Sequence, residues 1–300
     1  MPCVLDIVDD AAISLDEAVA ELADSGFAPR DGDSVTAAAG VLRRLGNNPD
    51  FLGDLIIEEL ARRHREVPDE NAYGPQAIML GRAGTDCLLR ANLWPSPAEP
   101  MMRSSGAAAF AYGVPHDHNF DFLTVGYFGP GYWSDYYEAD YDAIHGYTGE
   151  KVTLRSTGRH RLDLGRIQHY RAHVDVHAQL PADALSVSLN ILHTGGAQGW
   201  LDQYRFDPAA GEISGILTHG ASEAFLHIAV GLGGGEAADL AHRFARTHPS
   251  DRMRLHALDA LASVAGDAAA RDDLWRHAEG AGSRMVAMEA GARRRVLQGG

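Results

Sequence analysis

The chain of 300 residues has little cysteine, almost no lysine and no long apolar run. Its two cysteines, Cys3 and Cys87, argue against a disulfide framework and against a thiolate metal cluster. Lys151 is the only lysine, and the formal net charge is −15. Because phosphate binding requires a basic surface, this charge argues against a nucleic-acid partner. No apolar run approaches the roughly 20 residues that span a bilayer, so we expect no membrane segment.

The N-terminal residues, MPCVLDIVDD, do not have the basic segment followed by an apolar segment that marks a signal peptide. We therefore expect a cytoplasmic protein. The hydrophobic fraction of 45% is ordinary for a chain that buries a core. Histidine is abundant, at 15 residues. Imidazole is the commonest protein ligand of metal ions, so the positions of the histidines carry most of the functional prediction.

Residues 1–72 are predicted to form a helical segment. Ser14 and Glu17 form a capping box, and Gly26 ends the helix that follows. A second helix is predicted from a cap at Asp33 to Gly46. A third helix is predicted over NPDFLGDLIIEELARRHRE, with Pro68 beyond its end.

Residues 73–218 contain short runs of β-forming residues separated by glycine and proline. Runs of this length between turn residues are typical of a sandwich or a small barrel. Residues 208–212, PAAGE, are predicted to form a hairpin turn. The runs are QAIMLG, DCLLRANLW, AAAFAYGV, DFLTVGYFG, KVTLRS, HRLDLG, ALSVSLNILH, QYRFD and ISGILTH.

Residues 219–300 return to a helical pattern of short antiparallel helices, whose spacing suggests repeat packing of the HEAT type. The glycine-rich stretch GLGGGEAADL, residues 231–240, follows a helical run rather than a strand, so we interpret it as an interhelix turn and not as a nucleotide site. The predicted chain is therefore mainly β, with a β-domain between N- and C-terminal helical segments.

The stretch VPHDHNFDFLTVGYFGPGY contains His116 and His118, one residue apart. In a strand, residues i and i+2 point to the same face, so the two histidines could chelate one ion. The alternative is a solvated strand face with two histidines. The mostly apolar run that follows, FDFLTVGYFG, favours the metal, because a solvated face would alternate with polar residues.

A third ligand is sought downstream, where His169, His173 and His177 are spaced by four residues in GRIQHYRAHVDVHAQLP. One interpretation is a helix with a histidine stripe. The β-formers Val174 and Val176 favour a strand, in which all three histidines share one face. We expect His177 to complete the site and keep His173 as the alternative.

In the segment ALSVSLNILHT, Leu185, Val187, Leu189 and Ile191 alternate with Ser186, Ser188, Asn190 and Leu192. Ser186, Ser188 and Asn190 would lie on one face of a strand, with leucine, valine and isoleucine on the other. A polar face of this kind could line a ligand pocket.

Over residues 85–195 the chain resembles the cupins, and within them the thiol dioxygenases, of which cysteine dioxygenase is the best known. That family has an H-D-H motif near the start of a strand, a later ligand histidine and a strand reading S-L-H-L. Here the matching residues are His116-Asp117-His118, then His177, then Ser188-Leu189-Asn190-Ile191. The resemblance implies a jelly-roll-like β-barrel, often paired into a homodimer.

The resemblance also implies an activity and a set of residues. The three histidines would hold Fe²⁺, with Cu, Ni or Zn as alternatives that imidazole also suits. A small amino-acid-like or peptide substrate would react with O₂. Arg90, on a strand upstream of the H-D-H motif, is similar in place to the arginine that binds the substrate carboxylate, and Asn190 and His193 would lie in the pocket.

The chain departs from the family pattern at several positions. No cysteine follows the H-D-H motif, Asn190 replaces the histidine of the S-L-H strand, and His193 stands near the place of the family's tyrosine. Phe122 occupies the position of the glutamate that most cupins have, which favours a site of three histidines without a carboxylate. Non-catalytic cupins with a structural metal are therefore the alternative class of function. A zinc hydrolase is disfavoured, because H-E-x-x-H is absent.

Overall fold

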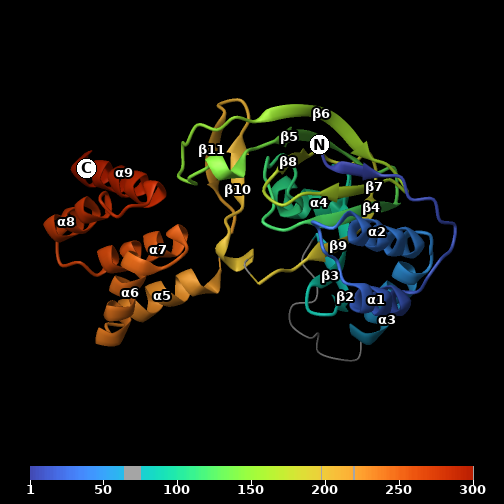
Figure 1. Ribbon diagram of the computed structural model, residues 1–300, viewed down its shortest axis with the longest axis horizontal. Coiled ribbons are helices and arrows are strands. Elements are labelled where there is room, and N and C mark those ends of the chain that lie inside the picture. Colours follow the sequence, from blue (N-terminus) through green and yellow to red (C-terminus); the bar gives the residue numbers. More distant parts are fainter. Residues whose placement is uncertain (64–75, 197, 219, 300) are drawn as a thin grey trace. The chain divides into compact units, whose positions relative to one another are not determined.

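The structure is a computed structural model that describes residues 1–63, 76–196, 198–218 and 220–299 (Figure 1). The predicted stop of the third helix at Pro68 lies outside the described residues. The chain divides into two compact units, one of residues 1–139 with 154–198 and one of residues 140–153 with 199–300.

The first unit contains a six-stranded antiparallel sheet in the order β1-β7-β4-β9-β3-β2. Glycines allow the tight turn after β4, since Gly129 and Gly131 both have positive φ (77° and 79°), as predicted for FGPGY. The strands of this sheet are β1 Cys3–Leu5, β2 Ala77–Ala83, β3 Cys87–Trp94, β4 Phe122–Phe128, β7 Ile167–Tyr170 and β9 Ser186–His193.

A three-stranded sheet in the order β6-β5-β8 faces one side of the larger sheet. Its strands are β5 Tyr132–Glu138, β6 Arg155–Leu162 and β8 Asp175–Gln179. Side-chain contacts between the sheets include the Trp94 and Tyr132 rings, whose centroids lie 4.0 Å apart, and the Tyr136 and Tyr170 hydroxyls, which lie 2.8 Å apart. Side chains on the inner faces of the two sheets therefore meet between them.

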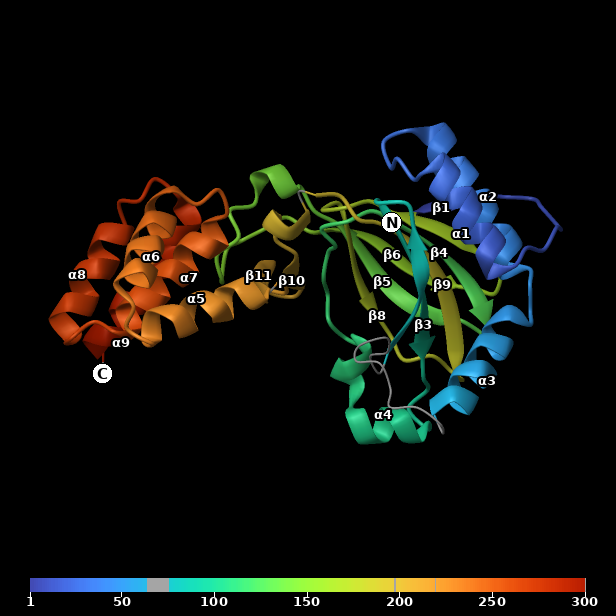
Figure 2. The ribbon, with the colours of Figure 1, turned by 90° about the horizontal axis from the view of Figure 1, so that it is seen from below.

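Helices α1 to α3 cover the other face of the larger sheet (Figure 2). The Ser14 capping box starts α1 as predicted, whereas the cap of α2 is Asp31 rather than Asp33. Leu22 and Leu42 are buried between these helices and the sheet. The helical elements of this unit are α1 Leu15–Ser25, α2 Gly32–Gly46, α3 Phe51–Arg63, α4 Pro100–Ser105 and the 3-10 turns η1 Ala107–Phe110 and η3 Gln198–Trp200, the last of which spans the unit boundary.

The strand predicted in AAAFAYGV is wrong, because η1 occupies its first half. Its alanines have no β-branched side chains, and Ala111 adopts a left-handed conformation (φ 56°) that ends the turn.

The second unit contains a hairpin and a set of helices with their own apolar core. The turn predicted at residues 208–212 is present at 208–211 and joins the two strands of the hairpin, because Glu212 already belongs to β11. Of the glycine-rich stretch 231–240, residues 232–234 separate α5 from α6 as predicted, whereas residues 235–240 belong to α6. The elements are η2 Tyr141–Ala143, β10 Tyr204–Asp207, β11 Glu212–Ile216, α5 Ala221–Gly231, α6 Gly235–Thr247, α7 Asp251–Ser263, α8 Ala268–Ala278 and α9 Arg284–Gly299.

The described chain is thus a mixture of sheets and nine α-helices rather than mainly β. In the described ranges the sheets are separate and do not close on one another, so the predicted barrel is not confirmed. The predicted segment boundaries at 72 and 218 differ from the limits of the compact units and stay a prediction. Among the described helices, none has the length and apolar character needed to cross a membrane.

Candidate metal centre

His116 and His177 are brought together by a short antiparallel bridge between the segment before β4 and strand β8. The His116 amide donates to the His177 carbonyl at 3.0 Å, and the His177 amide donates to the His116 carbonyl at 2.9 Å. Residues directly opposite one another in an antiparallel pair project their side chains to the same face. His118 lies two residues beyond His116 and projects to that face as well.

The three imidazoles converge through their Nε2 atoms. His118 Nε2 lies 3.0 Å from His177 Nε2, which lies 3.3 Å from His116 Nε2. The ligand atoms of the three residues all lie within 4.8 Å of one another. The side chains are buried, with exposed fractions of 5% for His116, 9% for His118 and 2% for His177.

Burial also decides the charge of these rings. Desolvation lowers the pKa of His116 and lowers the pKa of His118 and His177 well below the usual range. The neighbouring imidazoles lower the pKa of His118 and His177 further. The rings are therefore neutral at physiological pH, which is the form that binds metal ions.

The donor set fits a divalent ion. His116 Nδ1 lies 2.8 Å from the Val114 carbonyl, so Nδ1 carries the proton and Nε2 presents its lone pair. Two imidazole nitrogens on one ion, at about 2.0–2.1 Å and at tetrahedral or octahedral angles, lie about 2.9–3.4 Å apart. The two short Nε2–Nε2 distances match this spacing.

Two carboxylates lie near the three histidines, but each contacts a histidine outside the cluster. Asp117 Oδ2 is 3.8 Å from His173 Nδ1, and Asp121 Oδ1 is 3.2 Å from His169 Nε2. Among the residues that the structure describes, the cluster contains histidine alone. This agrees with the absence of glutamate at Phe122.

The prediction of one strand carrying His169, His173 and His177 is wrong. His169 is in β7 of the larger sheet and His177 is in β8 of the smaller sheet. The chain turns between them at His173, whose φ of 62° is left-handed and whose amide donates to the His118 carbonyl at 2.7 Å. The turn takes the His173 ring toward Asp117 instead of into the cluster.

Arg90 and Asn190 are opposite one another on β3 and β9, and both project to the inner face of the larger sheet. The side-chain amide of Asn190 donates a hydrogen bond from Nδ2 to the backbone carbonyl of Arg90 at 3.3 Å. Burial lowers the pKa of Arg90 to about 10. His193 projects to the opposite face, because it is an odd number of residues from Asn190, and its ring lies 6.3 Å from Phe27. It therefore does not face the three histidines.

Three aromatic residues around the cluster, Phe120, Phe122 and Tyr170, were not singled out as site residues by the sequence patterns. The Tyr170 ring lies edge-on to His177 at 4.9 Å, and the Phe120 and Phe122 rings each lie 4.9 Å from His118. The hydroxyl of Tyr170 forms a hydrogen bond with the hydroxyl of Tyr136. The sequence signal that could have identified Tyr170 is the alternation of IQHY, which places Tyr170 on the same strand face as the polar Gln168.

The inner faces of the sheets also carry buried polar atoms that have no hydrogen-bond partner in the described part of the chain. Such atoms cost free energy unless water or a ligand binds them. Together with the cluster they mark the space between the sheets as the candidate binding region. They are Arg90 Nε, Asn92 Oδ1, Thr124 Oγ1, Ser134 Oγ and Gln168 Nε2.

No family model matches this chain, and no curated protein matches it. Several solved structures are similar in part. One is a hydroquinone 1,2-dioxygenase in complex with Cd²⁺ and 4-hydroxybenzonitrile, which is 12% identical, with 42% of this chain and 69% of that chain covered and a TM-score of 0.27. A cupin protein from Bacteroides fragilis is 13% identical, with 43% and 86% covered and a TM-score of 0.24.

A third similar structure is a DMSP lyase from Ruegeria pomeroyi, 13% identical, with 65% and 78% covered and a TM-score of 0.25. TM-scores this low describe partial likenesses and carry no argument about activity. The three-histidine cluster is itself consistent with a cupin.

Proposed function

We propose that the chain is a metal-dependent, cupin-type oxidoreductase in which His116, His118 and His177 hold one divalent ion. The observation that supports it most is the convergence of three buried, neutral imidazoles through Nε2. Fe²⁺ is the proposed ion, with Cu, Ni and Zn as alternatives, because the donor set alone does not select among them. His173, the alternative third ligand of the sequence analysis, has its ring toward Asp117, so His177 is the proposed third ligand.

The ion, when bound, would supply open coordination positions at which a substrate and O₂ react as neighbours. The protein residues would hold the substrate in place. Arg90 would bind the carboxylate of a small amino-acid-like or peptide substrate, since a planar guanidinium matches a carboxylate. Asn190 would orient the strand that carries Arg90 through its amide hydrogen bond.

The aromatic residues would control water and protons. Phe120 and Phe122 pack against His118 and would exclude water from that side. The Tyr136 and Tyr170 hydroxyls form a buried pair beside His177 and could hold a proton near the reacting atoms.

A non-catalytic binding module with a structural metal is the second candidate. The low exposed fractions of the three histidines favour it, because structural sites are closed whereas catalytic sites keep an open position.

The test begins with metal analysis of the purified protein after anaerobic loading with Fe²⁺. We expect about one ion per chain, lost in His118→Ala and in His177→Ala. His173→Gly is the matched control, because glycine keeps the left-handed backbone while removing the imidazole. Metal retained in His118→Ala would contradict the site. Metal lost in His118→Ala and in His173→Gly but retained in His177→Ala would select His173 as the third ligand.

The second step separates the two candidate functions. O₂ uptake by the iron-loaded protein is measured against amino acids, thiols and small peptides. Uptake that is lost in His118→Ala supports the oxidoreductase. A loaded protein that gains thermal stability but consumes no O₂ with any of these substrates supports the structural metal.

A further inference from the structure

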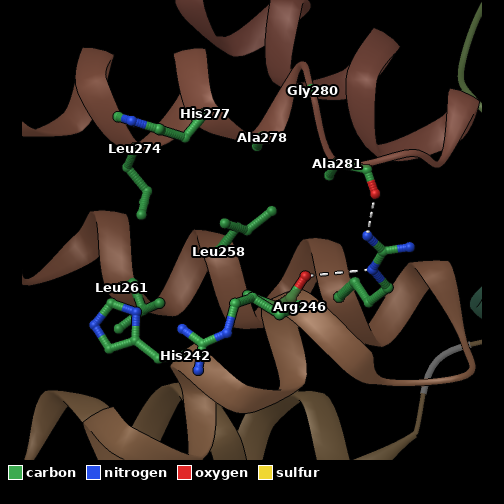
Figure 3. A pocket seen from close by; sticks show the side chains of 11 residues that line it. His242, Arg246, Leu258, Leu261, Leu274, His277, Ala278, Gly280 and Ala281 are labelled. Carbon is green, nitrogen blue, oxygen red and sulfur yellow. Dashed lines mark hydrogen bonds between the residues drawn. The ribbon is translucent and has the colours of Figure 1, made fainter.

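The second compact unit contains a hollow of about 390 Å³ between helices α6, α7 and α8 (Figure 3). His242 and Arg246 from α6 lie on one side of it, and Leu274 and His277 from α8 lie on the other. Its volume is within the lower part of the range of small-molecule sites in proteins. The full lining is His242, Ala245, Arg246, Arg254, Leu258, Leu261, Leu274, His277, Ala278, Gly280 and Ala281.

The lining of this hollow differs from the rest of the chain in its balance of basic and acidic residues. The sequence has 41 acidic residues against 26 lysines and arginines, yet the lining contains two arginines, two histidines and no aspartate or glutamate. A basic side chain that no acid compensates attracts anions to a concave surface.

The two arginines of the lining differ in whether other protein groups bind their guanidinium. The Arg254 guanidinium is occupied by the protein itself: it donates to the Ala245 and Ala281 carbonyls at 3.3 and 2.7 Å and pairs with Asp251 at 3.0 Å. It therefore fixes the wall of the hollow.

Arg246, in contrast, is exposed, and within the described residues no hydrogen bond or ion pair engages its guanidinium. His242 precedes it by four residues on α6, so the two side chains are neighbours on one helix face. Figure 3 shows both beside the hollow. Arg246 is therefore the group able to bind an incoming anion, with His242 next to it.

The remaining lining is apolar. Leu258 and Leu261 of α7 are buried, with exposed fractions of 6% and 8%, and Leu274 of α8 is half-buried. A ligand that only carried charge would leave this surface in contact with water. The lining suits a molecule that has an anionic head and an apolar body.

We propose that this hollow is a binding site for a small organic carboxylate with an apolar chain. The carboxylate binds the Arg246 guanidinium, and the chain packs on Leu258, Leu261 and Leu274. The site is distinct from the histidine cluster, which belongs to the other compact unit.

The experiment is titration calorimetry of the full chain with hexanoate, with hexanol as the uncharged probe. We expect one hexanoate site per chain and weaker binding of hexanol. Arg246→Gln should weaken hexanoate binding by about two- to fivefold, because an ion pair at an exposed guanidinium is lost. Arg243→Gln is the matched control: it removes an exposed arginine from the same helix, outside the lining, and should leave the affinity unchanged.

Several outcomes would overturn the proposal. They are no hexanoate binding, equal affinity for hexanol and hexanoate, and affinity unchanged in Arg246→Gln. Because Arg90 could also bind a carboxylate, His118→Ala and Arg90→Gln are titrated too. Binding kept in both supports the α6–α8 site, and binding lost in Arg90→Gln but kept in Arg246→Gln places the ligand at the sheets and overturns it.

Discussion

The two faces of the six-stranded sheet are made by the same strands but have opposite characters. On β9, Val187, Leu189 and Ile191 are buried under helices α1 to α3. Ser188 and Asn190 alternate with them and project toward the three-stranded sheet. The helix side of β9 is thus apolar, whereas its inner side has polar side chains together with the apolar Leu192.

The difference between the two faces indicates which face stabilises the fold and which face is available for binding. The helix-side face forms the largest apolar core of the first unit, and burial of that surface stabilises the fold. The inner face has buried polar atoms without partners in the described ranges, which stabilise nothing until something binds them. We therefore expect substitutions on the two faces to separate folding from binding.

The largest effect is expected from Leu189→Ala on the helix side. Leu189 is fully buried, so the change should lower the free energy of unfolding by about 2–5 kcal/mol through lost burial and a cavity. Urea denaturation followed by circular dichroism measures it. The folded fraction should still bind one metal ion per chain. Metal binding abolished in the folded fraction would mean that the two faces are not separable.

A smaller effect is expected from metal binding at the inner face. An ion that binds only the folded state, at a free concentration about 100 times its Kd, should stabilise the protein by about 2.7 kcal/mol. The gain should disappear on chelation and should be absent in His177→Ala. Thermal and urea unfolding with and without Fe²⁺ measure it, under anaerobic conditions. An equal gain in His177→Ala would place the ion elsewhere.

The smallest effect is expected from Arg90→Met. Burial of the guanidinium costs free energy, and its Nε lacks a partner among the described residues, so the apolar replacement should change the free energy of unfolding by less than about 1 kcal/mol. Metal content should also be unchanged. A loss of stability comparable to that of Leu189→Ala would show that the inner face holds the fold together, which would remove the contrast between the faces.

Local patterns predicted much of this molecule. The Ser14 cap, the hairpin turn in PAAGE and the glycine turn after β4 depend on a few consecutive residues, and each is present. The alternation of β9 could also be predicted from consecutive residues, because side chains in a strand repeat their orientation every two residues. Failures occurred where propensity was weak, as in the alanine-rich η1.

The pairing of His116 with His118 was likewise a local matter, because residues two apart in an extended chain share a face whatever the rest of the fold. The third member of the cluster was not. His177 joins it because β7 and β8 enter different sheets and the chain reverses at His173, which no spacing rule predicts.

Tertiary structure alone decided which distant groups meet. Arg90 faces Asn190 through the register of β3 on β9, and the Tyr136–Tyr170 pair exists only because two sheets stack. The hollow lined by Arg246 likewise depends on how three helices pack. Sequence determines local conformation through short-range sterics and hydrogen bonds, whereas contacts between distant residues depend on the packing of the whole chain.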